Sequence, residues 1–210
     1  RNAKISPPHH RLAAHGAHFR DVSGWEGADW YAGPGIVADP GPLSWERPAF
    51  WKTWEAEHRA CREGVIVMDM SFMSKFRVQG SDAGRLLDSM SGNAVNGDVG
   101  QITYTQWLNE RGTLEADLTV TKLPSSSDEG DDFLVIATDT AHRHVESQMR
   151  RHFGNAHAIV TDVTGGYAQI NVQGPRSREL LQLLTTADVA NDAFPFRAAR
   201  EIDIGFARVL

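Results

Sequence analysis

The sequence contains very little cysteine. Cys61 is the single cysteine among 210 residues, so no disulfide can form within the chain and a metal site built from several cysteines is excluded. This scarcity favours a reducing compartment. Cys61 lies on the apolar stripe of a predicted helix, and we expect a buried small hydrophobic residue there rather than a nucleophile.

Long hydrophobic runs and an excess of positive charge are also missing. No apolar stretch approaches the length of a membrane span, and the formal net charge is -6 with an isoelectric point near 5.8. Surfaces that bind nucleic acid or anionic lipid need clustered lysine and arginine. We therefore expect no nucleic-acid and no membrane partner, and a small molecule becomes the expected ligand.

Two kinds of cofactor motif are absent as well. No Gly-x-Gly-x-x-Gly follows a predicted strand, so a flavin-binding half is not expected within this sequence. The nine histidines include no set with carboxylate or cysteine at zinc-ligand spacing. The sequence therefore predicts no metal site.

The periodicity of the chain changes near residue 48. Residues 1–47 are rich in glycine, proline and histidine without a regular period, which predicts an extended N-terminal arm. Residues 48–210 predict one domain with the element order β-α-β-β-β-α-β, an α+β fold of antiparallel sheets and packed helices, related in part to a ferredoxin-like arrangement. The expected elements are a helix from Pro48 to Gly64, strands at 65–70 and 76–79, a helix capped by Ser81, a hairpin at 104–123, a polar loop at 124–132, a strand at 133–137, an amphipathic helix at 140–153 with Val145, Met149 and Phe153 inward, and strands at 158–163 and 167–172.

Both ends of the sequence are abrupt. Arg1 is not an initiator methionine, and residues 200–210 form a strand-like alternation with no polar tail after it. We therefore expect an incomplete domain whose C-terminal part is missing.

The segment from Tyr104 to Val120 carries the most informative pattern. Two alternating apolar runs flank the turn residues 109–112, which predicts a β-hairpin. A period of two places residues on alternate faces of a strand, and the faces are Leu114, Ala116, Leu118 and Val120 on one side and Glu115, Asp117, Thr119 and Thr121 on the other. Asp117 then lies either on water or in a pocket, and the alternation leaves both possibilities open.

One short pattern occurs twice. Val78-Gln79-Gly80 precedes Leu86-Leu87, and Val172-Gln173-Gly174 precedes Leu180-Leu181. A strand that turns sharply into a helix needs glycine at the bend. We therefore predict two structural strand-glycine-helix units rather than phosphate loops, because neither copy has the glycines and lysine of a P-loop.

A series of short segments, in order along roughly the whole chain, resembles a known family. The chain is similar to the folate-binding aminomethyltransferases, the T-protein of the glycine cleavage system, and more closely to the homologous region of dimethylglycine and sarcosine dehydrogenases. The segments that carry the resemblance are Ser6-Pro7, Gly24-Trp25-Glu26, 57–60, 67–71, 75–80, 104–106, 117–121 and 172–175.

The resemblance implies a T-protein-like fold and a bound tetrahydrofolate. It implies that Asp117 is the catalytic acid beside the reduced pterin, where it takes a proton or stabilises a cationic intermediate as the folate nitrogen captures a one-carbon unit. The product would be 5,10-methylenetetrahydrofolate. T-proteins often carry Asp-Asp-Leu where this chain has Ala116-Asp117-Leu118, so the role passes to Asp117 only if the second acid of that motif is the functional one.

The same resemblance implies further contacts and partners. Residues expected to contact the cofactor are Met70, Met73, Tyr104, Asn171 and Gln173. An FAD-dependent domain of the same parent chain would oxidise the methylated amine, in the mitochondrial matrix of a eukaryote or the cytoplasm of a bacterium. For the fragment alone we expect weak folate binding and no activity.

Two other readings stay open. The chain also resembles the regulatory subunit of pyruvate dehydrogenase phosphatase, in which the folate region serves interaction rather than catalysis. A folate-dependent aminomethyltransferase or demethylase would share the site, but it would lack the dehydrogenase-like N-terminal segments.

Overall fold

The computed structural model describes residues 3–42, 44–125 and 130–210, and its chain divides into two compact units. Unit 1 comprises Arg1–Phe72 and Ala168–Leu184, and unit 2 comprises Met73–Tyr167 and Thr185–Leu210. Each unit therefore combines two stretches that are far apart in the sequence. The first 47 residues share a unit with the residues that follow them up to Phe72.

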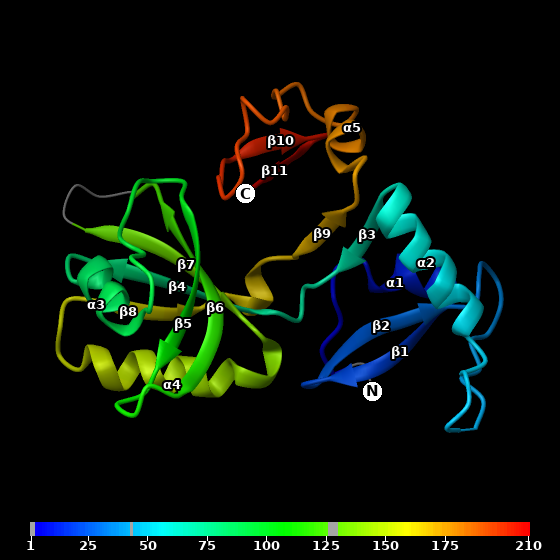
Figure 1. Ribbon diagram of the computed structural model, residues 1–210, viewed down its shortest axis with the longest axis horizontal. Coiled ribbons are helices and arrows are strands. Elements are labelled where there is room, and N and C mark those ends of the chain that lie inside the picture. Colours follow the sequence, from blue (N-terminus) through cyan, green and yellow to red (C-terminus); the bar gives the residue numbers. More distant parts are fainter. Residues whose placement is uncertain (1–2, 43, 126–129) are drawn as a thin grey trace. The chain divides into compact units, whose positions relative to one another are not determined.

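Unit 2 is built on a five-stranded antiparallel sheet with the strand order β5-β6-β7-β4-β8 (Figure 1). Its elements follow each other as β-α-β-β-β-α-β, so the predicted order and the α+β class are confirmed. The bounds are β4 Ser74–Gly80, α3 Ala83–Met90, β5 Ile102–Leu108, β6 Leu114–Leu123, β7 Asp131–Ala137, the 3-10 turn Asp139–Ala141, α4 His142–Phe153, β8 Ile159–Asp162 and the 3-10 turn Thr164–Gly166.

The core of unit 2 lies between one face of this sheet and the helices α3 and α4. Phe76 on β4 is fully buried, and Val145, Met149 and Phe153 of α4 pack into the same cluster. Residues spaced by three or four positions lie on one face of a helix, so the predicted inward stripe of α4 is confirmed. The helix α3 begins after Asp82 rather than at a Ser81 cap, and the Asp82 carboxylate instead accepts a hydrogen bond from the backbone N–H of His157 at 3.0 Å.

Two segments at the edges of unit 2 differ from the predicted elements. The predicted loop at 124–132 falls partly on residues 126–129, which lie outside the described residues, and Asp131 and Asp132 already belong to β7. The predicted alternation at 200–210 is a hairpin of β10 Ile202–Ile204 and β11 Ala207–Val209. A positive φ of 60° at Gly205 allows the tight turn between them.

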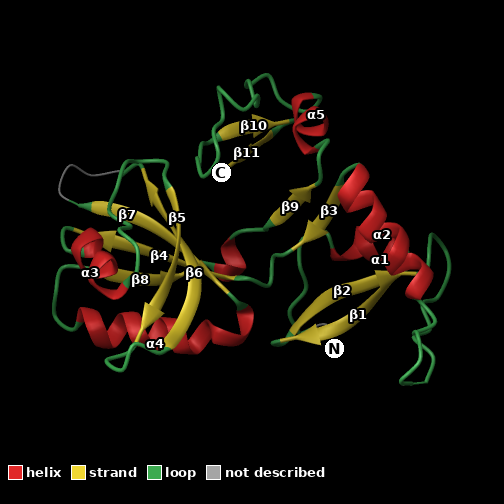
Figure 2. Cartoon of the chain, in the orientation of Figure 1, coloured by secondary structure: helices red, strands yellow, loops and turns green. Residues whose placement is uncertain are grey.

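Unit 1 contains regular structure where an irregular arm is predicted. Residues 1–47 include a helix and a two-stranded antiparallel hairpin (Figure 2), so the prediction of an extended arm is wrong for this stretch. The hairpin turns at Ser23 and Gly24, whose φ values of 51° and 87° are both positive, as a type I′ turn requires. The bounds in unit 1 are α1 His9–Ala14, β1 Ala17–Val22, β2 Trp25–Tyr31, α2 Trp51–Glu63, β3 Ile66–Asp69, β9 Ile170–Gln173 and α5 Ser177–Gln182.

Three predicted details of unit 1 need correction. The helix α2 begins at Trp51 rather than Pro48, although it ends before Gly64 as predicted. Cys61 is half-buried rather than buried. The predicted buried strand at 65–70 is a half-buried strand, β3, because it pairs with β9 in a two-stranded sheet instead of lying inside a larger one.

The repeated glycine is structural in both units. Gly80 and Gly174 have φ values of 139° and 126°, and each precedes a helix. A Cβ at Gly80 would collide with the carbonyl oxygen of His157, and a Cβ at Gly174 with that of Gly64. Close backbone approach therefore requires glycine at both positions.

Candidate functional site

Asp117 lies on the exposed side of β6. Ala116, Leu118 and Val120 are buried in the core on the other side of the strand, while Asp117 is exposed to solvent. The predicted alternation is therefore confirmed for these residues. Leu114 departs from it, since 61% of its surface is exposed at the end of the hairpin.

Two side chains of the neighbouring strand β5 hold the Asp117 carboxylate. The Tyr104 hydroxyl donates a hydrogen bond to Oδ2 at 3.0 Å, and the Gln106 amide donates to Oδ1 at 3.3 Å. The antiparallel register places Gln106 directly opposite Asp117 and Tyr104 one diagonal step away. The hydrogen bond to Asp117 raises the pKa of Tyr104, so the phenol stays protonated at neutral pH and remains a donor.

The rest of this sheet face continues across the strands from Asp117. Tyr104, Thr119, Ile136 and Lys75 are paired in one row across β5, β6, β7 and β4, and directly paired residues point to the same side. Lys75 is buried, and its Nζ donates to the Met73 carbonyl oxygen at 2.7 Å. The face thus combines a carboxylate, a phenol, a half-buried isoleucine and a buried ammonium group.

Arg77 adds a further charged group to the face. Its guanidinium makes a bidentate pair with Asp132, whose side chain is 1% exposed, and Gln79 also donates to this carboxylate at 3.0 Å. The hydrogen bond to Asp132 raises the pKa of Arg77. Because its partner lies on the neighbouring strand β7, Arg77 ties β4 to β7 and is already neutralised.

The predicted cofactor contacts are divided between the two units. Tyr104 and Asp117 are in contact in unit 2, which also contains the half-buried Met73. Unit 1 contains Met70, Asn171 and Gln173. The last two lie on β9, which pairs with β3, and the backbone N–H of Met70 donates to the Gln169 carbonyl at 2.8 Å beside this pair.

Glu115 does not share the Asp117 face, contrary to the prediction. The pairing of Trp107 with Ala116 is followed by that of Leu108 with Leu114, so Glu115 is an extra residue, a β-bulge. The bulge turns its side chain toward α4, where His144 Nε2 lies 2.8 Å and Gln148 Nε2 3.5 Å from the carboxylate. Strict alternation could not reveal the bulge, because a single inserted residue reverses the facing of its side chain.

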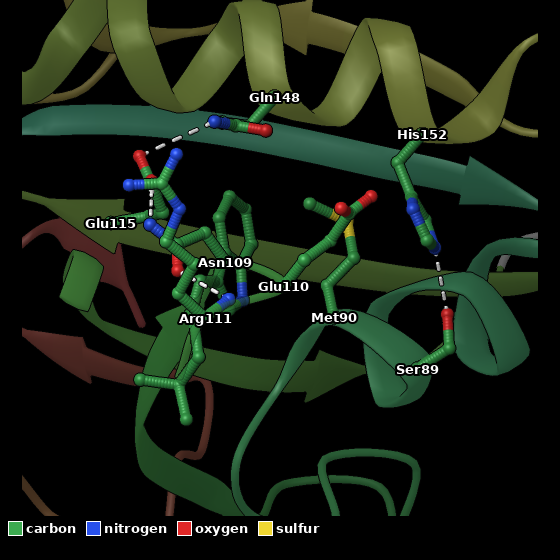
Figure 3. A pocket seen from close by; sticks show the side chains of 10 residues that line it. Ser89, Met90, Asn109, Glu110, Arg111, Glu115, Gln148 and His152 are labelled. Carbon is green, nitrogen blue, oxygen red and sulfur yellow. Dashed lines mark hydrogen bonds between the residues drawn. The ribbon is translucent and has the colours of Figure 1, made fainter. Parts of the chain in front are cut away.

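Several donors keep Glu115 ionised. Asn109, at the hairpin turn, donates to its other oxygen at 2.8 Å. The hydrogen bonds from Asn109 and His144, in that order, lower the pKa of Glu115, and the charge of Arg151 adds to this effect. The carboxylate therefore links the hairpin turn to α4 (Figure 3).

A hollow of about 870 Å³ lies beside this linkage. Figure 3 shows Arg111 and Gln148 near Glu115, and His152 on the other side, where its Nε2 lies 2.8 Å from the Ser89 hydroxyl. None of the predicted site residues lines this hollow, which is formed by Ser89, Met90, Trp107, Leu108, Asn109, Glu110, Arg111, Glu115, Gln148 and His152. In the described part of unit 2, the Asp117 carboxylate is therefore not part of the lining of this hollow.

The part of the chain that the structure describes offers neither a membrane span nor a metal cluster. None of its helices is both long and apolar enough to cross a bilayer. Within the same residues, no three histidine, cysteine or acidic side chains group so that they could hold a metal ion.

The fold matches that of a solved aminomethyltransferase. The crystal structure of the glycine cleavage system aminomethyltransferase T from Bartonella henselae superposes with a TM-score of 0.73 over 95% of this chain and 48% of that one, at 20% identity. The fold is therefore the one seen in this T-protein, and the chain covers about half of it.

The family follows from the sequence comparison. The GCVT N-terminal domain model matches residues 8–210, and the chain belongs to this family. The resemblance inferred from the short segments is thereby confirmed.

Curated relatives are much longer than this chain. It is 34% identical over 204 residues to 4-methylaminobutanoate oxidase (formaldehyde-forming) of Paenarthrobacter nicotinovorans, covering 97% of this chain and 24% of the relative. It is 28% identical to the mitochondrial pyruvate dehydrogenase phosphatase regulatory subunit of Mus musculus, covering 99% and 24%. The mitochondrial sarcosine dehydrogenase of Homo sapiens is 29% identical, with 93% and 25% covered. The chain spans about a quarter of these proteins.

Proposed function

We propose that this chain binds tetrahydrofolate and that Asp117 assists the capture of a one-carbon unit as 5,10-methylenetetrahydrofolate. The observation that carries the proposal is the exposed Asp117 carboxylate, held by Tyr104 and Gln106 on a sheet face of a GCVT N-terminal domain. Tetrahydrofolate, when bound, supplies the nitrogen that receives the carbon.

The residues present fit an acceptor role at this position. Each Asp117 oxygen accepts one hydrogen bond, Oδ2 from Tyr104 and Oδ1 from Gln106, and a carboxylate oxygen has a second lone pair. The exposed side of the carboxylate can therefore accept an N–H group or take up a proton at Oδ1 or Oδ2. Tyr104 and Gln106 keep the carboxylate in one orientation while it does so.

The remaining predicted contacts complete the proposal. Met73 in unit 2 would supply apolar surface to a pterin bound at Asp117. For unit 1, Met70 with its apolar side chain and Asn171 and Gln173 with their amide groups stay predicted folate contacts.

The wider protein context is part of the same proposal. We infer an FAD-dependent domain in the same parent chain that oxidises a methylated amine, since the relatives named as oxidase and sarcosine dehydrogenase are about four times longer than this chain. In a eukaryote the protein would act in the mitochondrial matrix, and in a bacterium it would act in the cytoplasm.

Two relatives favour alternatives. The oxidase of Paenarthrobacter nicotinovorans is named as formaldehyde-forming, so this chain could belong to a protein that releases the carbon instead of transferring it to folate. The phosphatase regulatory subunit favours a role in interaction without catalysis. Retention of Asp117 with both of its donors argues for the catalytic reading.

Product analysis in the intact flavoprotein tests the role of Asp117. Asp117→Asn keeps the shape of the side chain but removes the proton acceptor, so we expect the yield of methylenetetrahydrofolate to fall by about 100-fold or more. Amine oxidation, followed by electron-acceptor reduction, stays unchanged. Formaldehyde then replaces the folate product.

A matched control uses the exposed Glu110 of the hairpin turn, for which Glu110→Gln leaves both products unchanged. An unaltered methylenetetrahydrofolate yield in Asp117→Asn removes Asp117 from the reaction.

For the 210-residue chain alone we expect weak folate binding by calorimetry, with a Kd on the order of 1 mM or higher. Tight binding to this chain contradicts the proposal that further chain segments complete the folate site.

A further inference from the structure

Glu57, on α2 of unit 1, is a half-buried carboxylate. Among the described residues it has no hydrogen bond and no ion pair, whereas Asp29 pairs with Arg20 at 3.2 Å and Asp69 accepts the Ser71 hydroxyl at 2.6 Å. Burial raises the pKa of Glu57, and the neighbouring charge of His58 only partly opposes this effect. The group therefore gains from any cation that reaches it.

A hollow of about 500 Å³ gives access to this carboxylate. Its wall combines the Tyr31 ring at the end of β2 with His15 and with the apolar side chains of Leu12, Ala32 and Pro34. All of these residues belong to unit 1. The hollow therefore presents one negative charge among largely apolar surfaces.

The Tyr31 phenol lies in the negative electrostatic field of nearby carboxylates. Burial raises the pKa of its phenol, and the charges of Glu57 and Asp69 raise it further. The phenol is therefore neutral at physiological pH, and the electron-rich face of a neutral aromatic ring attracts cations.

We propose that this hollow binds a small methylated ammonium ion, with Glu57 as its counter-ion. An ammonium nitrogen that keeps at least one proton donates a charge-assisted hydrogen bond to the Glu57 carboxylate. Its methyl groups contact Leu12, Ala32 and Pro34 and the Tyr31 ring. A bare metal ion is a poor ligand here, because a single carboxylate does not supply the several ligands that metal sites need.

The lining of the hollow predicts an order of affinity among small cations. Dimethylammonium has both methyl groups and N–H donors, so it binds best. Tetramethylammonium lacks the donor, and ammonium lacks the methyl groups, so both bind more weakly. Sodium has neither feature and acts only through ionic strength.

An NMR titration of the 210-residue chain tests the proposal. With dimethylammonium chloride we expect saturable shifts of Tyr31 and Gly33 signals with a midpoint on the order of 1–10 mM. Sodium chloride at equal ionic strength gives smaller, non-saturating shifts. Equal responses to dimethylammonium and sodium overturn the proposal.

A pair of variants on the same helix sharpens the test. Glu57→Gln removes the counter-ion and lowers the affinity for dimethylammonium by about tenfold or more, while Glu55→Gln, at an exposed position of α2, leaves it unchanged. Equal affinity in Glu57→Gln and the unsubstituted chain overturns the proposal, as does an equal loss in Glu55→Gln.

A measurement without substitution covers the case in which Glu57→Gln does not fold. In the unsubstituted chain, saturation with dimethylammonium stabilises the charged carboxylate and lowers the pKa of Glu57, followed by the pH dependence of its side-chain signals. A pKa that does not move on saturation rules out Glu57 as the counter-ion.

Discussion

Unit 2 and unit 1 differ in how completely each buries and pairs its own side chains. The continuous cluster of buried apolar residues lies entirely in unit 2, where strands and both helices contribute to it. Among the described residues of unit 1, Trp30 is the large apolar side chain that is buried, at 5% exposure. Phe50, which stacks on Trp30, and Trp54, which contacts Phe50, are half-buried.

The buried polar atoms show the same contrast. In the described ranges, the buried side-chain nitrogen and oxygen atoms without a hydrogen-bond partner all belong to unit 1, and they are Ser6 Oγ, His9 Nδ1, His18 Nδ1, Trp30 Nε1 and Gln169 Oε1. Buried polar groups are normally paired. Among the described residues, unit 2 therefore pairs the polar atoms of its interior more completely than unit 1 does.

Truncation of an aromatic residue in each unit tests this contrast most strongly. Phe76 is fully buried in unit 2, so Phe76→Ala leaves a cavity and lowers the free energy of unfolding by about 3–5 kcal/mol. Phe50 in unit 1 stacks on Trp30 at 4.9 Å but is half-buried, so Phe50→Ala costs about 1–2 kcal/mol. Urea unfolding followed by circular dichroism measures both, and equal losses would remove the distinction between the units.

Gly80 and Gly174 test a feature that the two units share, a glycine in close contact with a backbone carbonyl. Gly80→Ala and Gly174→Ala each force a Cβ against a backbone carbonyl at positive φ, and each lowers stability by about 1–3 kcal/mol. Gly112 is the control, because its φ is also positive, at 74°, but nothing lies within 4 Å of its Cβ position. A cost at Gly112 that equals the other two would show that strain alone, without the close approach, determines the effect.

The smallest effect concerns the pH dependence of unit 2. In the folded chain the pKa of Glu115 is lowered from its ordinary value of 4.5. The ionised carboxylate therefore stabilises the fold above that pH, and this contribution is lost as the pH falls through the folded pKa. Glu115→Gln therefore flattens the fall in stability below about pH 4.5. Urea midpoints measured at several pH values check this, with Glu110→Gln as the control that keeps the original slope.

Local patterns in the sequence determined most of unit 2. The inward stripe of α4 and the buried face of β6 follow from the spacing at which side chains recur on one face of a helix or a strand. Once one face is packed, this spacing determines which residues are buried. The turn at 109–112 likewise predicts the hairpin of β5 and β6, but it is the bulge at Glu115 that shifts the register so that Gln106 lies opposite Asp117. Elements of this kind depend on neighbours in the sequence, so residue order is enough to predict them.

Tertiary structure alone decided the remaining features. The pairing of β3 with β9 joins residues about one hundred positions apart, and the bulge at Glu115 turns a carboxylate away from the Asp117 face toward His144 on α4. Glu57 and Tyr31 meet at one hollow although they lie on different elements. These features depend on pairing and packing between distant segments, which leave no periodic pattern in the sequence. The hydrogen bonds and the burial gained between those segments stabilise these arrangements.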